Sequence, residues 1–140
     1  MIRAAIDSNV VVAALRSETG ASNELLELLL QGRWQLVLSN TVLGEYHEIL
    51  HREVAVIGLS HARVDAFLDG LCSMAEQITL VTDWQPVAND PDDEPIVQLA
   101  RESRVSYLVT HNVRDVAPAE RFGVRVVRPG EFLNLVRQTL

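Results

Sequence analysis

The chain of 140 residues is predicted to fold as an α/β protein built on a five-stranded, mainly parallel sheet. Short apolar runs alternate with longer segments of helical periodicity along the chain, which is the order that crossover connections in a parallel sheet produce. The first run, Ile2–Ile6, lacks regular polar alternation, as expected of a strand buried on both faces. The composition is 48% hydrophobic, enough for the core of one domain spanning residues 1–140.

The other strands are expected from the same kind of short apolar run. The five predicted strands are Ile2–Ile6, Trp34–Leu38, Ile78–Val81, Tyr107–Thr110 and Val124–Val127. Two connections are predicted to be loops. Trp84–Pro95 is polar and interrupted by proline, and His111–Asp115 follows the fourth strand directly.

Capping residues and glycines set the expected helix boundaries. The first predicted helix begins at Asn9 or Val10, and the second is capped by Ser22 or Asn23. The third is capped by Ser39 or Asn40 and runs to about Arg52, and the fourth is capped by Ser60. The last two span Glu94–Ser103 and Glu131–Val136, and Pro129 precedes the final one. The leucines of Leu25–Leu30 make the second helix apolar on more than one side. Such a helix is either deeply buried, the commoner case, or in contact with a partner chain.

Charge and cysteine content narrow the functional classes. The net charge is −7, and all 12 basic residues are arginine, so binding to a polyanion requires a local arginine patch or bound cations. The absence of lysine excludes a P-loop ATPase. The single thiol, Cys72, cannot form an internal disulfide and suits a reducing cytosol. The N-terminal apolar run is too brief for a signal peptide, and no apolar stretch could span a bilayer, so we expect a cytoplasmic protein without membrane contact.

Two acids fall where a ligand would bind in an open α/β sheet. Asp7 directly follows the first strand and therefore lies at the carboxyl edge of the sheet, although it could equally cap the next helix. Glu45 lies early in the helix after the second strand, near the same edge. Its alternative role is to stabilise the positive end of the helix dipole.

Further acids recur later in the chain. Four lie within Asp90–Glu94, and they repel one another unless something positive sits among them. A helix cap explains one of these aspartates but not the cluster. Asp115 follows the fourth strand, where a simple turn residue is the alternative. Because Mg²⁺ prefers oxygen ligands, converging acids predict a site for one or two such ions.

The order of these motifs resembles the PIN domain, a family of metal-dependent ribonucleases, and especially the bacterial PIN-type toxins of toxin–antitoxin pairs. The residues that carry the resemblance are Ile6-Asp7-Ser8-Asn9-Val10, Ser39–Glu45, Asp90–Ile96 and Leu108–Asp115. Each motif is short, and the ordered set covers nearly the whole chain.

The resemblance implies a three-layer α/β/α fold with four acids around Mg²⁺ or Mn²⁺. It maps these metal ligands and catalytic residues onto Asp7, Glu45, Asp93 and Asp115, with Asp92 as a rival to Asp93. Many relatives carry an aspartate where this chain has Asn112, so either Asn112 or Asp115 is the fourth ligand, and the number of metals stays open. It also implies that the first and fourth strands are neighbours.

The function implied is that of an endoribonuclease, the toxin of a toxin–antitoxin pair, with RNA as substrate and with a small antitoxin and a second copy of the chain as partners. The residues expected to orient the ligands or water are Ser8, Asn9, Thr110 and Asn112. Arg114 is a candidate contact to RNA phosphate, or else a solvated surface residue.

Two other functions remain open from the sequence. Haloacid-dehalogenase-like phosphatases also place a nucleophilic aspartate after a strand, but they have a second aspartate where this chain has Asn9, and they use a downstream basic residue, whereas lysine is absent. A catalytically silent module that binds proteins is favoured by Asn112, which brings no charge to a metal.

Overall fold

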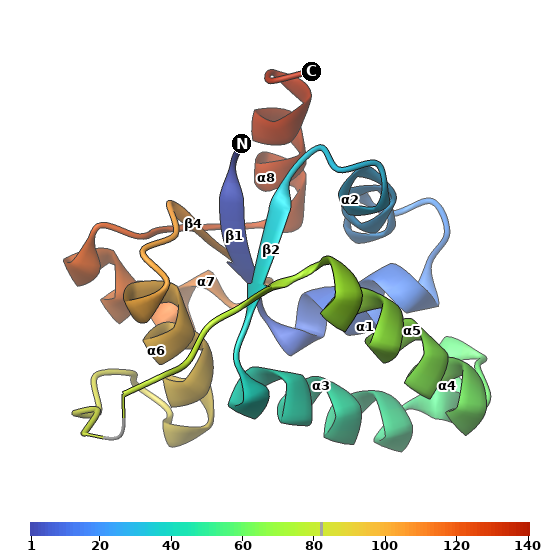
Figure 1. Cartoon of the computed structure of the whole chain (residues 1–140), viewed down its shortest axis with the longest axis horizontal. Helices are drawn as coiled ribbons and strands as arrows, with labels where there is room; N and C mark the ends of the chain where they lie inside the picture. The colour runs from blue at the N-terminus through green and yellow to red at the C-terminus, as the bar shows by residue number, and fades with distance from the viewer. Residues whose placement is uncertain (82) are drawn as a thin grey trace.

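A five-stranded parallel sheet runs through the centre of the molecule (Figure 1). The computed structural model describes residues 1–81 and 83–140. Its strands are β1 (Arg3–Ile6), β2 (Gln35–Leu38), β3 (Glu76–Gln77), β4 (Tyr107–Val109) and β5 (Arg125–Val127). They lie in the order β3-β2-β1-β4-β5, and each neighbouring pair is parallel. The predicted fold class is therefore confirmed.

The order in which the chain adds strands reverses between β1 and β4. The chain steps outward from β1 to β2 and β3, then crosses back past β1 to β4 and β5. Ile6 pairs with Val109, and the backbone amide of Asp7 donates to the carbonyl oxygen of Val109 at 2.9 Å. Asp7 and Thr110, the residues that follow these two strands, consequently flank the crevice where open α/β sheets bind ligands.

Helices cover both faces of the sheet. The helices are α1 (Ser8–Arg16), α2 (Ala21–Leu30), α3 (Asn40–Arg52), α4 (Val54–Ile57), α5 (His61–Met74), α6 (Glu94–Glu102), α7 (Val113–Val116) and α8 (Pro129–Arg137), with short 3₁₀ helices η1 (Pro91–Asp93) and η2 (Ala117–Phe122). Figure 1 shows α6 and α7 on one side of the sheet and α1, α2 and α5 on the other. The result is the expected three-layer α/β/α arrangement. In the part of the chain that the structure describes, none of these helices has the length and apolarity to cross a bilayer.

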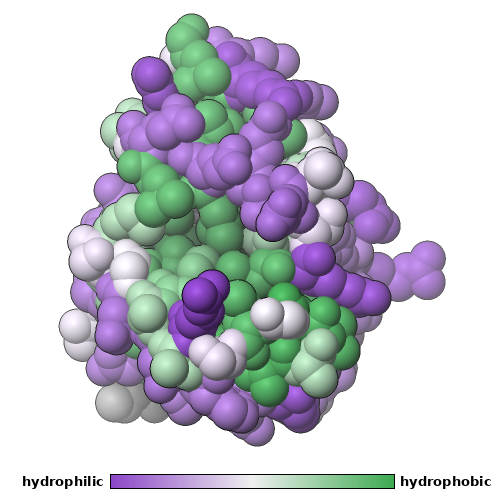
Figure 2. Space-filling model, turned by 90° about the vertical axis from the view of Figure 1, so that its right-hand side faces the viewer, coloured by the Kyte–Doolittle hydropathy of each residue, from purple (hydrophilic) through white to green (hydrophobic). Residues whose placement is uncertain are grey.

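The leucine-rich helix α2 is mostly a core element. Its first four leucines, Leu25, Leu26, Leu28 and Leu29, are buried, whereas Leu30 is 68% exposed. The buried indole of Trp34 donates to the carbonyl oxygen of Leu25 at 2.8 Å and packs edge-on against Phe132 of α8. Figure 2 faces this side of the molecule and shows hydrophobic residues gathered between polar ones. Deep burial, the first alternative predicted for α2, is therefore confirmed for four of its five leucines, and contact with a partner chain stays a prediction.

Most element boundaries differ from the predictions by one or two residues, and two elements need a physical explanation. The helix α2 begins at Ala21 with Gly20 as its N-cap, not after Ser22 or Asn23, because Ser22 is buried and the Asn23 amide instead donates to the carbonyl oxygen of Ala14 at 2.9 Å. The third strand is Glu76–Gln77 rather than Ile78–Val81. Ladder pairing in this edge strand precedes the apolar run, and only the amide of Ile78 continues it, donating to Leu38.

Short helices also occupy segments predicted as loops. The 3₁₀ helix η1 forms inside Trp84–Pro95, where the Asp90 carboxylate accepts a hydrogen bond from the amide of Asp92 at 3.0 Å. The helix α7 begins within His111–Asp115, with Asn112 as its N-cap. Neither has more than four residues, so neither has room for an apolar periodicity that the sequence could reveal.

Candidate functional site

A cleft of about 280 Å³ opens at the carboxyl edge of the sheet. It lies where the β1–α1 junction, α3 and η1 meet. The cleft is lined by Asp7, Ser8, Glu45, Glu48, Ile49, Arg52, Asp92 and Asp93. The structure thus brings together, from three separate segments, three of the four acids predicted as metal ligands, along with the rival Asp92.

Asp7 has both of the roles considered for it. It is the N-cap of α1, and its Oδ1 accepts a hydrogen bond from the amide of Ser8 at 2.8 Å. Its Oδ2 accepts one from the hydroxyl of Thr110 at 2.9 Å. Each carboxylate oxygen still has a lone pair to offer, so capping and metal binding are compatible.

A hydrogen-bond network behind Asp7 joins the ends of β1 and β4. The hydroxyl oxygen of Thr110 accepts from the Asn9 amide group at 3.3 Å and from the Asn112 backbone amide at 3.0 Å, while it donates to Asp7. The Asn9 side-chain oxygen accepts from the amide of His111 at 3.2 Å. The predicted orienting residues Asn9 and Thr110 therefore fix the Asp7 carboxylate, and Asn112 contributes through its backbone.

Glu45 reaches the cleft from the second turn of α3. The adjacent residue, Tyr46, is fully buried, and its hydroxyl donates to the carbonyl oxygen of Ile6. This bond fastens α3 to the end of β1, one residue before Asp7. Packed core residues therefore hold the backbone that carries Glu45 beside the end of β1.

Mutual repulsion and burial perturb the acids of the cleft. Burial and then the charge of Asp7 raise the pKa of Glu45 to about 7. The same two causes, in the same order, raise the pKa of Asp93 to about 6. Burial also raises the pKa of Asp7, and its hydrogen bond from Thr110 opposes that rise. A bound cation would favour the ionised form of each group.

The acidic run Asp90–Glu94 divides into distinct roles. Asp93 is partly buried in the cleft, whereas Asp92 lines it from an exposed position. Glu94 serves the preceding loop, because its carboxylate accepts hydrogen bonds from the Trp84 indole at 2.9 Å and from the amides of Val87 and Ala88 at 2.8 and 2.6 Å. This division favours Asp93 over Asp92 as the more enclosed carboxylate.

The fourth predicted acid lies at the margin of the site. Asp115 is exposed in the first turn of α7 and does not line the cleft, but its charge contributes to the raised pKa values of Asp7 and Asp93. Asn112 is also exposed and caps α7. Arg114 is exposed beside them, and its carbonyl oxygen accepts from Asn89 at 3.5 Å.

Sequence reasoning did not identify Arg52 and Glu48 as residues of the site. Both line the cleft with Glu45 and Ile49. Glu48, Ile49 and Arg52 follow Glu45 by three, four and seven positions, so all four residues lie on one face of α3. That spacing was available in the sequence. Arg52 gives the acidic cleft an exposed cation, suited to a phosphate group.

The donor set determines what the cleft can hold. Carboxylate oxygens from separate segments, close enough to raise one another's pKa, match the ligands that hard divalent cations take. The only sulfur ligand in the sequence other than methionine is Cys72, which lies elsewhere. The residues present therefore fit Mg²⁺ or Mn²⁺ better than a soft metal.

Comparison with known proteins agrees with this architecture. The family model described as "PIN domain" matches residues 3–114. No curated protein matches the chain. Among solved structures, it is similar to a chain in the crystal structure of VapBC2 from Rickettsia felis bound to a DNA fragment from their promoter, with 17% identity, a TM-score of 0.61, and coverage of 91% of this chain and 98% of that one. Because the family model spans most of the sequence, the chain belongs to the PIN domain family.

Proposed function

We propose that this protein is a metal-dependent endoribonuclease that uses Mg²⁺ or Mn²⁺ to hydrolyse phosphodiester bonds in RNA. The observation that carries the proposal is the convergence of Asp7, Glu45 and Asp93 on one cleft, where the charge of Asp7 raises the pKa of the other two. Asp115 is proposed as the fourth ligand, from its electrostatic reach to Asp7 and Asp93. Membership of the PIN family supports a nuclease.

The chain's own residues have separate tasks in this proposal. Thr110 and Ser8 hold the two oxygens of Asp7 in place, so the carboxylate is oriented before any ion arrives. Arg52, at the cleft, is suited to bind a phosphate of the RNA, and Arg114 is a second candidate. A divalent ion, when bound, would offset charge on the phosphoryl group and lower the pKa of a water molecule.

We further propose that the protein is the toxin of a toxin–antitoxin pair and acts in the cytoplasm as a homodimer. The fold likeness to the VapBC2 complex supports an antitoxin partner. An apolar groove of about 300 Å³ between α2 and α5 offers a surface for it. The groove includes Leu26, Leu29, the exposed Leu30, Phe67 and Met74.

The test is cleavage of labelled RNA by the purified chain with and without Mg²⁺ or Mn²⁺. The decisive variant is Asp7→Asn, because asparagine caps a helix as well as aspartate does, while it removes the charge and replaces one of the two acceptor oxygens with an amide donor. Cleavage should fall to the level seen without metal, while circular dichroism should show that the variant stays folded. The control is Glu131→Gln, an exposed acid of α8 paired with Arg125 outside the cleft, which should cleave normally.

Two outcomes would replace this proposal. If the wild type neither cleaves RNA nor gains thermal stability with millimolar Mg²⁺, the cleft is catalytically silent and the protein is a binding module. If a phosphorylated Asp7 is trapped with a phosphate ester, the aspartate is a nucleophile and the protein is a phosphatase. Metal-dependent cleavage that persists in Asp7→Asn contradicts the assigned site directly.

A further inference from the structure

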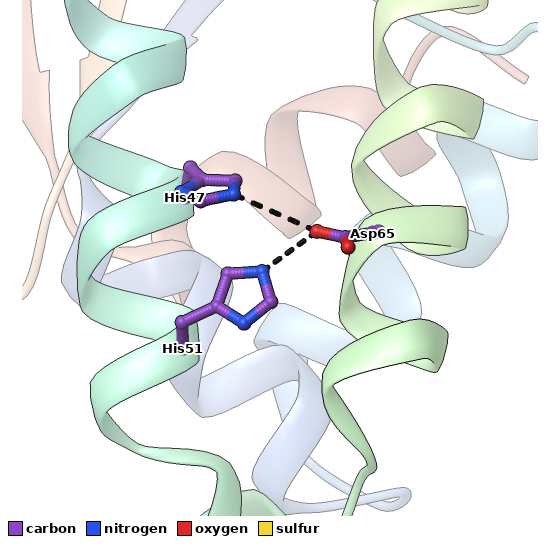
Figure 3. Close-up of side chains that lie close together, drawn as sticks. All are labelled: His47, His51 and Asp65. Carbon is purple, nitrogen blue, oxygen red and sulfur yellow. Dashed lines mark hydrogen bonds and ion pairs between the residues drawn. The ribbon is translucent and has the colours of Figure 1, made fainter.

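Three side chains of types that can ligate a metal ion lie close together between α3 and α5 (Figure 3). His47 and His51 project from α3 toward Asp65 of α5, and one ligand atom from each lies within 4.8 Å of the others. The Nε2 atom of His51 lies 2.7 Å from Oδ1 of Asp65, and Nε2 of His47 lies 3.6 Å from the same oxygen. Both imidazole nitrogens therefore point at the same carboxylate oxygen of Asp65.

A fourth side chain fixes the orientation of His51. Nδ1 of His61 lies 2.6 Å from Nδ1 of His51, and the two rings are stacked. One proton bridges these nitrogens. If His61 donates it, the Nε2–H of His51 donates to Asp65; if His51 donates it from Nδ1, the Nε2 atom of His51 keeps a lone pair beside the Asp65 oxygen, where a cation can bind. Histidine ligands of metals characteristically donate their other ring nitrogen in this way.

The histidine cluster is separate from the acidic cleft. On α3 the cleft face carries Glu45, Glu48 and Arg52, whereas the face toward α5 carries His47 and His51, four residues apart and hence one above the other. The side chains of His47 and Asp65 are 60% and 57% exposed, and that of His51 is 19% exposed. A metal ion in solution can therefore reach the cluster without passing through the cleft.

We propose that His47, His51 and Asp65 form a binding site for a transition-metal ion, with Zn²⁺ as the best match. Two imidazole nitrogens and one carboxylate oxygen, with an open fourth position for water, are a common zinc ligand set. Imidazole ligands disfavour Mg²⁺ and Ca²⁺, so this site and the acidic cleft select different ions. The ion would tie α3, which carries Glu45, to α5.

The test is calorimetric titration of the whole chain with ZnCl₂ in the presence of millimolar Mg²⁺, which competes for the acidic cleft. We expect one zinc per chain in the wild type and at least about tenfold weaker binding in His47→Ala, since a single lost orienting contact already costs about 10–100-fold. His61→Ala should weaken binding within that range. The matched control is His111→Ala, which removes the one histidine outside the cluster and should bind zinc normally.

A second measurement distinguishes the two sites. Zinc binding under these conditions should survive in Asp7→Asn, and Co²⁺ bound to the wild type should give a visible absorption band that His47→Ala abolishes. The proposal is overturned if zinc binding is unchanged in His47→Ala, or if it is lost in Asp7→Asn and kept in His47→Ala. Neither result would bear on RNA cleavage with Mg²⁺, so the proposed nuclease activity is tested independently.

Discussion

Replacement of Thr110 by valine tests whether the Asp7 carboxylate is held by a hydroxyl group. Thr110 is fully buried, and valine has nearly the same shape, so the main loss is the bond to Asp7 at 2.9 Å. A hydrogen bond to a charged group contributes about 1.5–3 kcal/mol, and two amide donors, from Asn9 and Asn112, lose their acceptor as well. Water can reach the exposed Asn112, so we expect Thr110→Val to lower the free energy of unfolding by about 2–3 kcal/mol.

The loss corresponds to a fall of roughly 5–10 °C in melting temperature for a chain of this size. Because the Thr110 hydroxyl lowers the pKa of Asp7, its removal should also weaken Mg²⁺ binding. Urea unfolding and Mg²⁺ titration measure the two effects. Thr110→Ser is the control, since it keeps the hydroxyl and loses one methyl group, at a cost of about 1 kcal/mol. Equal destabilisation in the two variants, with equal Mg²⁺ affinity, would refute the reasoning.

Three further predictions follow from the charges of the cleft. Because the pKa of Glu45 is raised to about 7, its contribution to stability is complete below about pH 4.5 and is lost as the pH rises through about 7. The melting temperature of the metal-free protein should therefore fall across that pH range, and Glu45→Gln should make this fall smaller. In Mg²⁺ titrations, Asp93→Asn should weaken binding more than Asp92→Asn, because Asp93 is the more buried, and the reverse order would make Asp92 the ligand. Arg52→Gln should raise the KM for RNA with little change in Mg²⁺ affinity, and kinetics with unaltered KM would assign Arg52 to the solvated surface.

The sequence sufficed to predict the sheet and most of the cleft. Asp7 was identifiable because it directly follows a buried strand. Its neighbours at the sheet edge depend on the order of the strands. Glu45 was predicted near the same edge from its place in the helix, the family resemblance singled out Asp93, and the structure brings both to Asp7. The sequence could not show that Glu94 turns to the Trp84–Ala88 loop, because neighbouring acids have the same composition signal whichever way they point.

Other features could not be predicted because the segments are too short to show a periodic pattern or because they depend on tertiary packing. The register of β3 is set by two exposed edge residues that pack on nothing periodic. The helices α4 and η2 have four and six residues, too few for a recognisable apolar face. Arg52 was identifiable in principle, because its spacing of seven residues from Glu45 places both on one face of α3. The histidines of α3 and α5 meet only through tertiary packing.

The bond from Tyr46 to the carbonyl oxygen of Ile6 has a consequence for how the protein responds when it loses its ion. Since the tyrosine ring is embedded in the core, the helix bearing Glu45 cannot swing outward to separate the negative groups. An empty cleft must instead take up protons, which the elevated pKa values of Glu45 and Asp93 make possible near neutrality. Capture of a divalent ion should then expel those protons, so that acidification of an unbuffered solution would report metal uptake.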